Sequence, residues 1–175
     1  DIGVPVLGGF YSIGIYSDRC CFVVDYSLSM KGEKLASLKE NMKDTISGMR
    51  DYVQFNISEF GGDVNVLYDG ALVDDKKKAI SYVDSQPMTL GTRSMDAFER
   101  GMMVSGEVDT VYFLSDGAPM KGQLQKWGAI SQLIRLMNRY RHVAMSTICF
   151  KAGKQNALSM EHVADQNYGH SEEIE

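Results

Sequence analysis

The most informative segment of the sequence is Cys20-Cys21-Phe22-Val23-Val24-Asp25-Tyr26-Ser27-Leu28-Ser29-Met30. Its first five residues are all apolar and polar residues follow directly, which is typical of a strand buried on both faces. Such strands occur in parallel sheets that helices cover on each side. The segment therefore predicts an α/β fold and places Asp25 at the carboxyl end of a buried strand.

Oxygen-bearing side chains alternate directly after this strand. In extended chain, the carboxylate of Asp25 and the hydroxyls of Ser27 and Ser29 point to one side, because residues two apart share a face. Hard cations such as Mg²⁺ prefer these oxygen ligands, with waters completing an octahedron. The alternative is a turn that caps the next helix, with Ser29 as N-cap and Lys31-Gly32 as the turn. These residues by themselves do not exclude that alternative.

A second segment repeats the features of the first. Residues 110–119 read Thr-Val-Tyr-Phe-Leu-Ser-Asp-Gly-Ala-Pro, so another apolar run ends at an aspartate, Asp116. Residues 143–150 predict a third buried strand. In open parallel sheets, the loops at the carboxyl ends of adjacent strands form the ligand crevice. We therefore expect Asp25 and Asp116 to lie at one edge of the sheet.

The remaining segments alternate between helix and strand. Apolar spacing of three and four residues predicts helices at residues 35–53, 74–84, 95–102, 127–140 and 156–167. Alternating polarity on either side of Gly61-Gly62 predicts a hairpin of residues 53–60 and 63–68. Residues 88–94 are a predicted loop, and residues 168–175 a tail with a final edge strand.

This order predicts an α/β, doubly wound, Rossmann-like three-layer sandwich. Its central sheet is mostly parallel with one antiparallel edge strand, and helices lie on both faces. Residues 1–19 are expected to form an N-terminal arm or an edge strand, and residues 20–175 a single domain. Because the chain begins at Asp1, we expect it to be a fragment of a larger protein.

Composition excludes several classes of protein. The chain has 175 residues, of which 44% are hydrophobic and 23% charged, as in soluble globular domains. The net charge of −5 argues against nucleic acid as a partner, and no apolar run is long enough to insert into a membrane. Three cysteines cannot all pair, so we expect Cys20, Cys21 and Cys149 to be buried free thiols.

With these segments the chain resembles the von Willebrand factor type A domain, also known as the integrin inserted domain, in its bacterial form. The metal-ion-dependent adhesion site (MIDAS) of that family combines Asp-x-Ser-x-Ser with a loop threonine and an aspartate after a later strand. Asp25-Tyr26-Ser27-Leu28-Ser29, Gly91-Thr92 and Ser115-Asp116-Gly117 match the three parts. The resemblance extends roughly from Ser17 to Tyr168.

The resemblance implies a magnesium site, for which Mn²⁺ or Ca²⁺ are possible substitutes. Its implied ligands are the hydroxyls of Ser27 and Ser29, Thr92 directly or through water, and Asp25 and Asp116 directly or through bound waters. Two carboxylates would leave the ion electrophilic toward an added anion. In family members this anion is often an aspartate or glutamate of a partner protein, so the resemblance implies a metal-dependent adhesion or scaffold module and not an enzyme.

The rim of this site differs from the family pattern. Leu28 stands where many members carry glycine, and Arg93-Ser94 follows the threonine where asparagine or a small residue is frequent. Neither position is a ligand. We expect Leu28, Arg93 and the exposed methionines Met30 and Met120 to form a partner-binding rim. The resemblance favours the cell envelope or an exported location over the cytoplasm, and leaves the oligomeric state open.

Two other functions compete with this interpretation. A magnesium-dependent phosphohydrolase would use Asp25 as nucleophile, but it usually needs a carboxylate two residues later, where this chain has Ser27. The glycine patterns of nucleotide-binding loops and of the nucleophile elbow do not occur after any predicted strand. A metal-independent scaffold that uses another surface is also compatible with the fold.

Overall fold

The computed structural model describes residues 6–175. Its main sheet has six strands in the order β5-β4-β3-β6-β7-β8, and only the pairing of β4 with β5 is antiparallel. The fold class and the antiparallel edge strand predicted from the sequence are confirmed. The strand bounds are β3 (Arg19–Asp25), β4 (Gln54–Phe60), β5 (Val64–Val66), β6 (Thr110–Ser115), β7 (Ala144–Phe150) and β8 (Ser171–Ile174).

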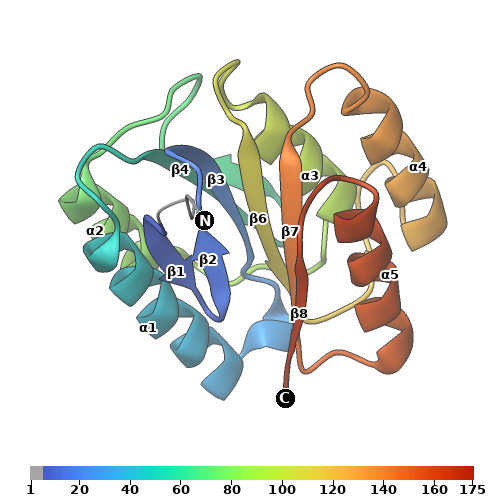
Figure 1. Cartoon of the computed structure of the whole chain (residues 1–175). Helices are drawn as coiled ribbons and strands as arrows, with labels where there is room; N and C mark the ends of the chain where they lie inside the picture. Colours follow the sequence, from blue (N-terminus) through green and yellow to red (C-terminus); the bar gives the residue numbers. More distant parts are fainter. Residues whose placement is uncertain (1–5) are drawn as a thin grey trace.

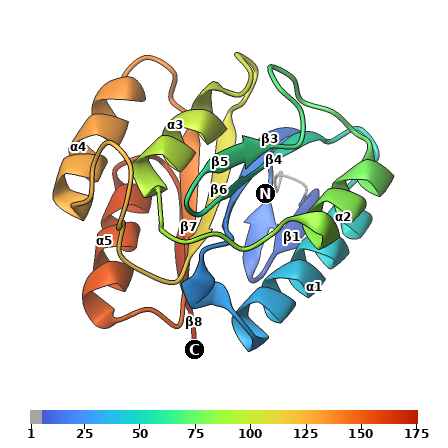
Figure 2. The same cartoon turned by 180° about the vertical axis from the view of Figure 1, so that it is seen from behind.

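Helices cover both faces of this sheet. One face carries α1 and α2, and the other carries α3, α4 and α5, which are seen best from behind (Figures 1 and 2). The helix bounds are η1 (Leu28–Met30), α1 (Glu33–Gly48), α2 (Lys76–Ser85), α3 (Ser94–Met103), α4 (Trp127–Met137) and α5 (Lys154–Asp165). No helix in residues 6–175 has the length and apolar character needed to cross a bilayer.

The alternation of side chains along β3 divides the interior into two cores. Phe22 and Val24 pack into the core beneath α1 and α2, whereas Cys21 and Val23 pack into the core beneath α3, α4 and α5. Both sets are fully buried, as expected for a central strand covered on each face. The prediction for the cysteines is confirmed, because all three are buried and free.

The N-terminal segment forms a hairpin of its own. Strands β1 (Gly8–Phe10) and β2 (Ile13–Ile15) pair antiparallel in a separate two-stranded sheet, beside α1 in Figure 1. Phe10 is fully buried, and its ring lies 5.2 Å from that of Phe22 in an edge-to-face contact. Residues 8–15 therefore do not form an edge strand of the main sheet. Their alternating apolar side chains pack instead into the core on one face of that sheet. Residues 1–5 of the predicted arm lie outside the described part.

Two predicted helices are shorter than their apolar stripes. Met49 and Val53 follow α1 in extended or turn conformation yet remain buried, so they extend the core without extending the helix. Beyond α4, Asn138 bonds both the amide and the carbonyl of Val143, which turns the chain into β7. Tyr140, the last residue of the predicted helix 127–140, lies beyond α4 and is 82% exposed.

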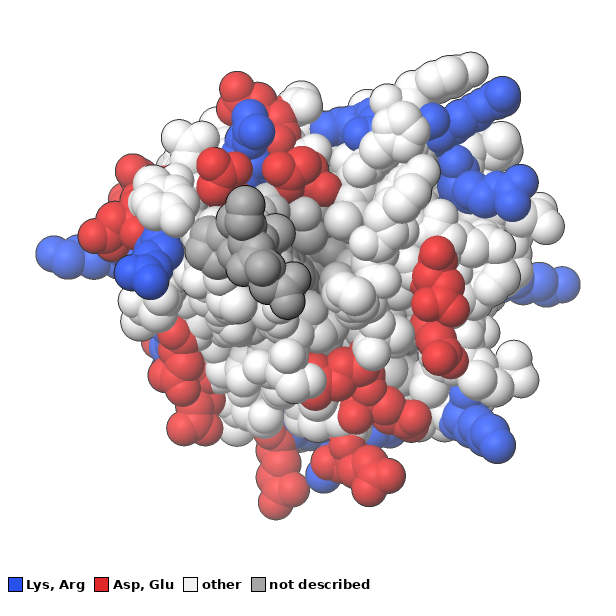
Figure 3. Space-filling view, viewed as in Figure 1, with Lys and Arg blue, Asp and Glu red and all other residues white. Residues whose placement is uncertain are grey.

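Charged side chains are mixed on the face that carries the hairpin. Acidic residues predominate on the lower half of this face, while lysines and arginines lie mainly near its upper and lateral margins (Figure 3). This distribution agrees with the net charge of −5. That nucleic acid is not a partner stays a prediction.

Candidate metal centre

Three loops meet at the carboxyl ends of the central strands. β3 and β6 are neighbours in parallel register, so the residues that follow Val24 and Leu114 leave the same edge of the sheet, the lower edge in Figure 1. The third loop, between α2 and α3, joins them through a bridge of Ser27 with Thr89 and a 3.1 Å hydrogen bond from the amide of Leu28 to the carbonyl of Thr89. This edge therefore gathers all three segments that carry the predicted site residues.

Asp25 lies at the end of β3 with no exposed surface. Its Oδ1 accepts a 2.8 Å hydrogen bond from the amide of Ser27, and its Oδ2 accepts one of 2.6 Å from the hydroxyl of Ser115. Burial raises the pKa of Asp25 to about 6, because desolvation outweighs these hydrogen bonds, and the charge of Asp116 raises it further. Asp25 is thus held by one donor at the end of β6 and one in the loop that follows β3.

The two serines and Asp116 form a continuous chain of oxygens. The hydroxyls of Ser27 and Ser29 are 2.9 Å apart, and that of Ser29 donates a 2.7 Å hydrogen bond to Oδ1 of Asp116. The side chains of residues 27 and 29 therefore face the same point, as the sequence predicts. The capping alternative is wrong, because the N-cap of α1 is Gly32, whose φ of 90° suits a glycine, and not Ser29.

A lysine contacts the other oxygen of Asp116. Nζ of Lys34 lies 2.6 Å from Oδ2, and the Asp116 side chain is only 3% exposed. Lys34 is not predicted from the sequence as part of the site, because its place in the first turn of a surface helix identifies it only as a solvated side chain. A carboxylate this buried needs a counter-charge, and Lys34 supplies it.

Thr92 is held beside the Asp116 loop. It is 5% exposed, and its carbonyl accepts hydrogen bonds of 3.0 and 3.1 Å from the amides of Met120 and Lys121. Gly91, with φ of 114°, supplies the left-handed turn before it, and the side chain of Lys121 passes close to that glycine. The structure therefore brings Thr92 to the same edge of the sheet as the aspartates and serines.

The residues of the predicted rim differ in exposure, and whether they bind a partner stays a prediction. Leu28 and Met120 are 46% and 69% exposed, and Arg93 is partly exposed while its Nε donates to the carbonyl of Gly62 at 2.5 Å. Met30 is wrong as a rim residue. It is fully buried, because the turn of η1 directs its side chain into the core beneath α1. Leu90, which is not among the predicted rim residues, is 69% exposed on the loop before Thr92.

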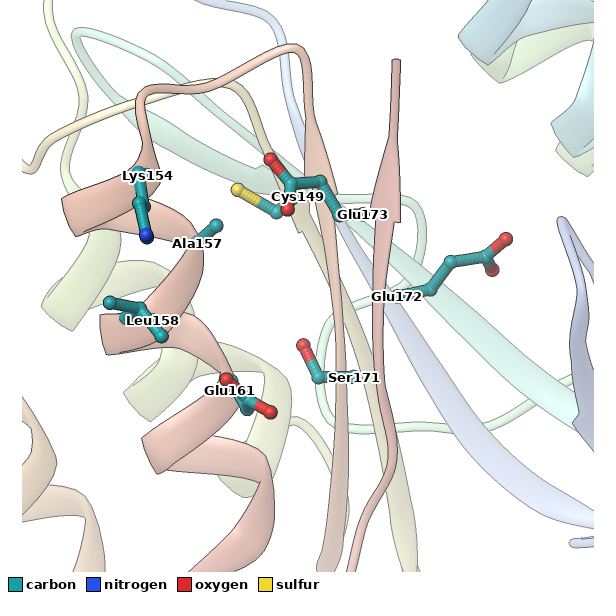
Figure 4. A pocket seen from close by; sticks show the side chains of 8 residues that line it. All are labelled: Cys149, Lys154, Ala157, Leu158, Glu161, Ser171, Glu172 and Glu173. Atoms are coloured by element: carbon teal, nitrogen blue, oxygen red, sulfur yellow. The ribbon is translucent and has the colours of Figure 1, made fainter.

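A separate cavity of about 210 Å³ lies between α5 and the strands β7 and β8. Figure 4 shows its lining, which includes Cys149, Lys154, Glu161 and Glu173 but none of the five predicted metal ligands. Burial raises the pKa of the Cys149 thiol to about 11, so this cysteine is not an activated nucleophile. Within residues 6–175, no group of three or more His, Cys, Asp or Glu side chains is placed to hold a metal ion. A metal site in this part of the chain would therefore need hydroxyl ligands as well.

The donor set at the strand ends fits a hard cation. It contains two carboxylates and neutral hydroxyls and no nitrogen or sulfur, which is the oxygen chemistry that Mg²⁺ selects. A cation, the Lys34 ammonium, is already seated against Asp116. The Asp116 end of this oxygen set therefore already accommodates a positive charge.

Comparison with known proteins identifies the family. A sequence profile described as the von Willebrand factor type A domain matches residues 20–171. A search of curated proteins finds no match.

Solved structures share the fold at low sequence identity. A von Willebrand factor type A protein from Catenulispora acidiphila has a TM-score of 0.74 and 17% identity, over 93% of this chain and 40% of that one. The vWF domain of the type V pili tip protein Mfa5 from Porphyromonas gingivalis has a TM-score of 0.70 and 11% identity, over 87% of this chain and 88% of that one.

A third structure carries a metal. Proximal thread matrix protein 1 from the mussel byssus, with a zinc-occupied MIDAS motif, has a TM-score of 0.64 and 18% identity, over 86% of this chain and 40% of that one. The chain thus spans well under half the length of this protein and of the Catenulispora protein. At these sequence identities, the structural similarities establish a shared fold and do not establish a shared function.

Proposed function

The chain belongs to the von Willebrand factor type A domain family, and from this premise we propose that it is a metal-ion-dependent protein-binding module. Such domains are often interaction or adhesion modules. The observation that supports the proposal is the series of hydrogen-bonded oxygens from Ser27 through Ser29 to Asp116. Asp116 in turn contacts the ammonium group of Lys34. We propose binding, not catalysis, as the activity of this site.

Asp25, Ser27, Ser29, Thr92 and Asp116 are the proposed ligands of a Mg²⁺ ion, with Mn²⁺ or Ca²⁺ as substitutes. When bound, the ion supplies an electrophile that accepts an anionic ligand. Ser27, Ser29 and Asp116 would present oxygens to it, and Asp25 holds the Ser27 loop by accepting the amide of Ser27. Thr92 contributes from the third loop, whose backbone is tied to Met120 and Lys121.

The surroundings of the site define the kind of partner. Leu28, Leu90 and Met120 expose apolar side chains on the three loops that meet at the site, and Lys121 and Arg93 add positive charge between them. A partner segment with an aspartate or glutamate between apolar side chains matches such a surface. Its carboxylate would bind the metal, and its apolar side chains would contact the exposed apolar residues around the site. We propose a protein ligand of this chemistry.

Asp25 is a poor candidate for the nucleophile of a phosphohydrolase. It has no exposed surface, and both its oxygens already accept hydrogen bonds from Ser27 and Ser115. A nucleophilic carboxylate must reach its substrate, so this arrangement favours a structural role for Asp25 in the metal site.

An exported or envelope-associated location in bacteria is proposed for this protein. The support is the shared fold with the Mfa5 domain, which comes from a pili tip protein, together with the adhesion chemistry proposed above. Detection of the protein in fractionated cells tests this location.

Calorimetric titration of the chelator-treated protein with Mg²⁺ and Mn²⁺ tests the metal site. We expect the parent to bind one ion, and Asp25→Ala and Asp116→Ala to remain folded without binding it. Asp165→Ala, which removes an exposed aspartate from the end of α5, is the matched control and should bind as the parent does. No binding by the parent at millimolar metal would refute the proposal and leave a metal-independent scaffold.

A further inference from the structure

The contact between Lys34 and Asp116 joins two residues that the family pattern does not connect. The ammonium of Lys34 lies 2.6 Å from Oδ2 of Asp116, while Oδ1 accepts the hydroxyl of Ser29. Both oxygens of this carboxylate are therefore engaged. The lysine side chain is 25% exposed, so it approaches the buried aspartate from the solvent side of the site.

The position of Lys34 in its helix does not explain this contact. Lys34 is the second residue of α1, and the amino-terminal turn of a helix disfavours a positive charge because the helix dipole is positive there. Glu33, the preceding residue, has the charge that this turn prefers. The interaction that compensates Lys34 is thus with Asp116, across a sequence separation of 82 residues.

We propose that Lys34 is a built-in competitor of the divalent ion: its ammonium neutralises Asp116 when no ion is bound and must release Oδ2 when one binds. This inference rests on the proposed metal-binding function and adds a regulatory residue to it. Asp116 would otherwise be a buried carboxylate without a counter-charge, so Lys34 stabilises the metal-free domain at the expense of metal affinity.

The competition has a definite sign. A divalent ion and an ammonium at one carboxylate repel each other, so removal of the lysine charge should tighten metal binding. We expect an increase of about tenfold or more in affinity, because the pair is only partly exposed and solvent screens it incompletely. The same substitution should destabilise the protein in chelator, where Asp116 loses its only cationic neighbour recorded within residues 6–175.

Lys34→Met is the variant of choice, because methionine retains the length of the side chain and a high helix propensity without the charge. Lys34→Arg keeps the charge and serves as the conservative variant. Lys43→Met is the matched control, since Lys43 lies on the same helix and pairs with Asp84 at 3.1 Å, away from the site. The dissociation constant for Mn²⁺ is measured by calorimetry, and the melting temperature is measured in chelator and with Mn²⁺.

The expected result is tighter Mn²⁺ binding by Lys34→Met, a lower melting temperature of that variant in chelator, and recovery of this loss when Mn²⁺ is added. Lys34→Arg and Lys43→Met should bind as the parent does. A parent that does not bind Mn²⁺ would refute the proposed function, and with it the competition, because the inference rests on that function. If the parent binds and Lys34→Met binds equally or more weakly, the competition is refuted while the metal site stands. If neither binds, both proposals fail.

Discussion

The hydroxyl of Ser115 donates a 2.6 Å hydrogen bond to Oδ2 of Asp25 and so links the ends of β6 and β3. The other oxygen of Asp25 accepts the amide of Ser27, whereas Asp116 contacts Ser29 and Lys34. The two carboxylates therefore have different partners, neutral donors for Asp25 and a hydroxyl together with an ammonium group for Asp116. Asp25 orients the loop that carries the serines, and Asp116 faces a cation.

Replacement of Ser115 by alanine should destabilise the protein. The Asp25 carboxylate would lose the hydroxyl that donates to its Oδ2 within a fully buried site, and an unmet buried hydrogen bond to a charged group costs about 1–3 kcal/mol. Urea denaturation in chelator at pH 7 measures the loss. Ser159→Ala is the control, because the Ser159 hydroxyl bonds only the carbonyl of Gln155 within α5, and its stability should match the parent. Equal stability of Ser115→Ala and the parent would refute the assigned role.

Asp25 should make the stability of the chelator-treated protein depend on pH. Its pKa of about 6 in the folded state is above the ordinary value of 3.8, so the folded state holds the proton more tightly between these values. The resulting stability is present near pH 4 and is lost as pH rises through 6, by at most ~3 kcal/mol.

Asp25→Asn tests this, because asparagine has the same shape and does not titrate. We expect the variant to gain stability relative to the parent as pH rises from 4 to 7, when unfolding free energies of the two proteins are compared in chelator. It should also fail to bind Mn²⁺. A difference in stability that stays constant across this pH range would contradict the elevated pKa.

The main features of the fold follow from local patterns in the sequence. Five consecutive apolar residues at 20–24 and a similar run at 110–114 identify strands that are covered on both faces, and the structure places them side by side. The Gly61-Gly62 turn correctly predicts the antiparallel edge strand β5. Once the strands are placed, the order of the chain brings Asp25 and Asp116 to one edge.

Other features depend on contacts that no local pattern encodes. Lys34 reads as a solvent-facing residue because periodicity reports only the apolar stripe of a helix, and its partner is far away in the sequence. The sequence alone predicts an exposed Met30. Packing against the core sets the direction of the short 3₁₀ turn and buries this side chain. The alternation at residues 10–16 is equally compatible with an edge strand and with the observed hairpin, since both have period two.

The hairpin β1–β2 should be essential to the stability of the domain. Phe10 is fully buried against Phe22 and Tyr112, so Phe10→Ala should lower the free energy of unfolding by about 3–5 kcal/mol. Val6→Ala is the control, because Val6 is 52% exposed, and it should change stability by less than about 0.5 kcal/mol. Chemical denaturation measures both. A small effect of Phe10→Ala would mean that residues 20–175 fold without the hairpin.

The turn of the β4–β5 hairpin should control the metal site through backbone contact. A Cβ at Gly62 would lie 2.7 Å from the carbonyl oxygen of Leu90, which is backbone and cannot swing away. Gly62→Ala should therefore displace the loop that carries Thr92 and weaken Mn²⁺ binding by about tenfold, as loss of an outer-shell support of a metal ligand typically does.

Gly128→Ala is the matched control, because nothing lies within 4 Å of the added methyl group in α4. This variant should bind Mn²⁺ with parental affinity and melt at the parental temperature or above it, since alanine favours a helix more than glycine does. Calorimetry at a temperature well below both melting transitions separates an effect on the site from unfolding. If Gly62→Ala is folded and binds Mn²⁺ as tightly as Gly128→Ala, the Thr92 loop does not contribute to metal affinity, and the proposed ligand set is reduced to the residues that follow β3 and β6.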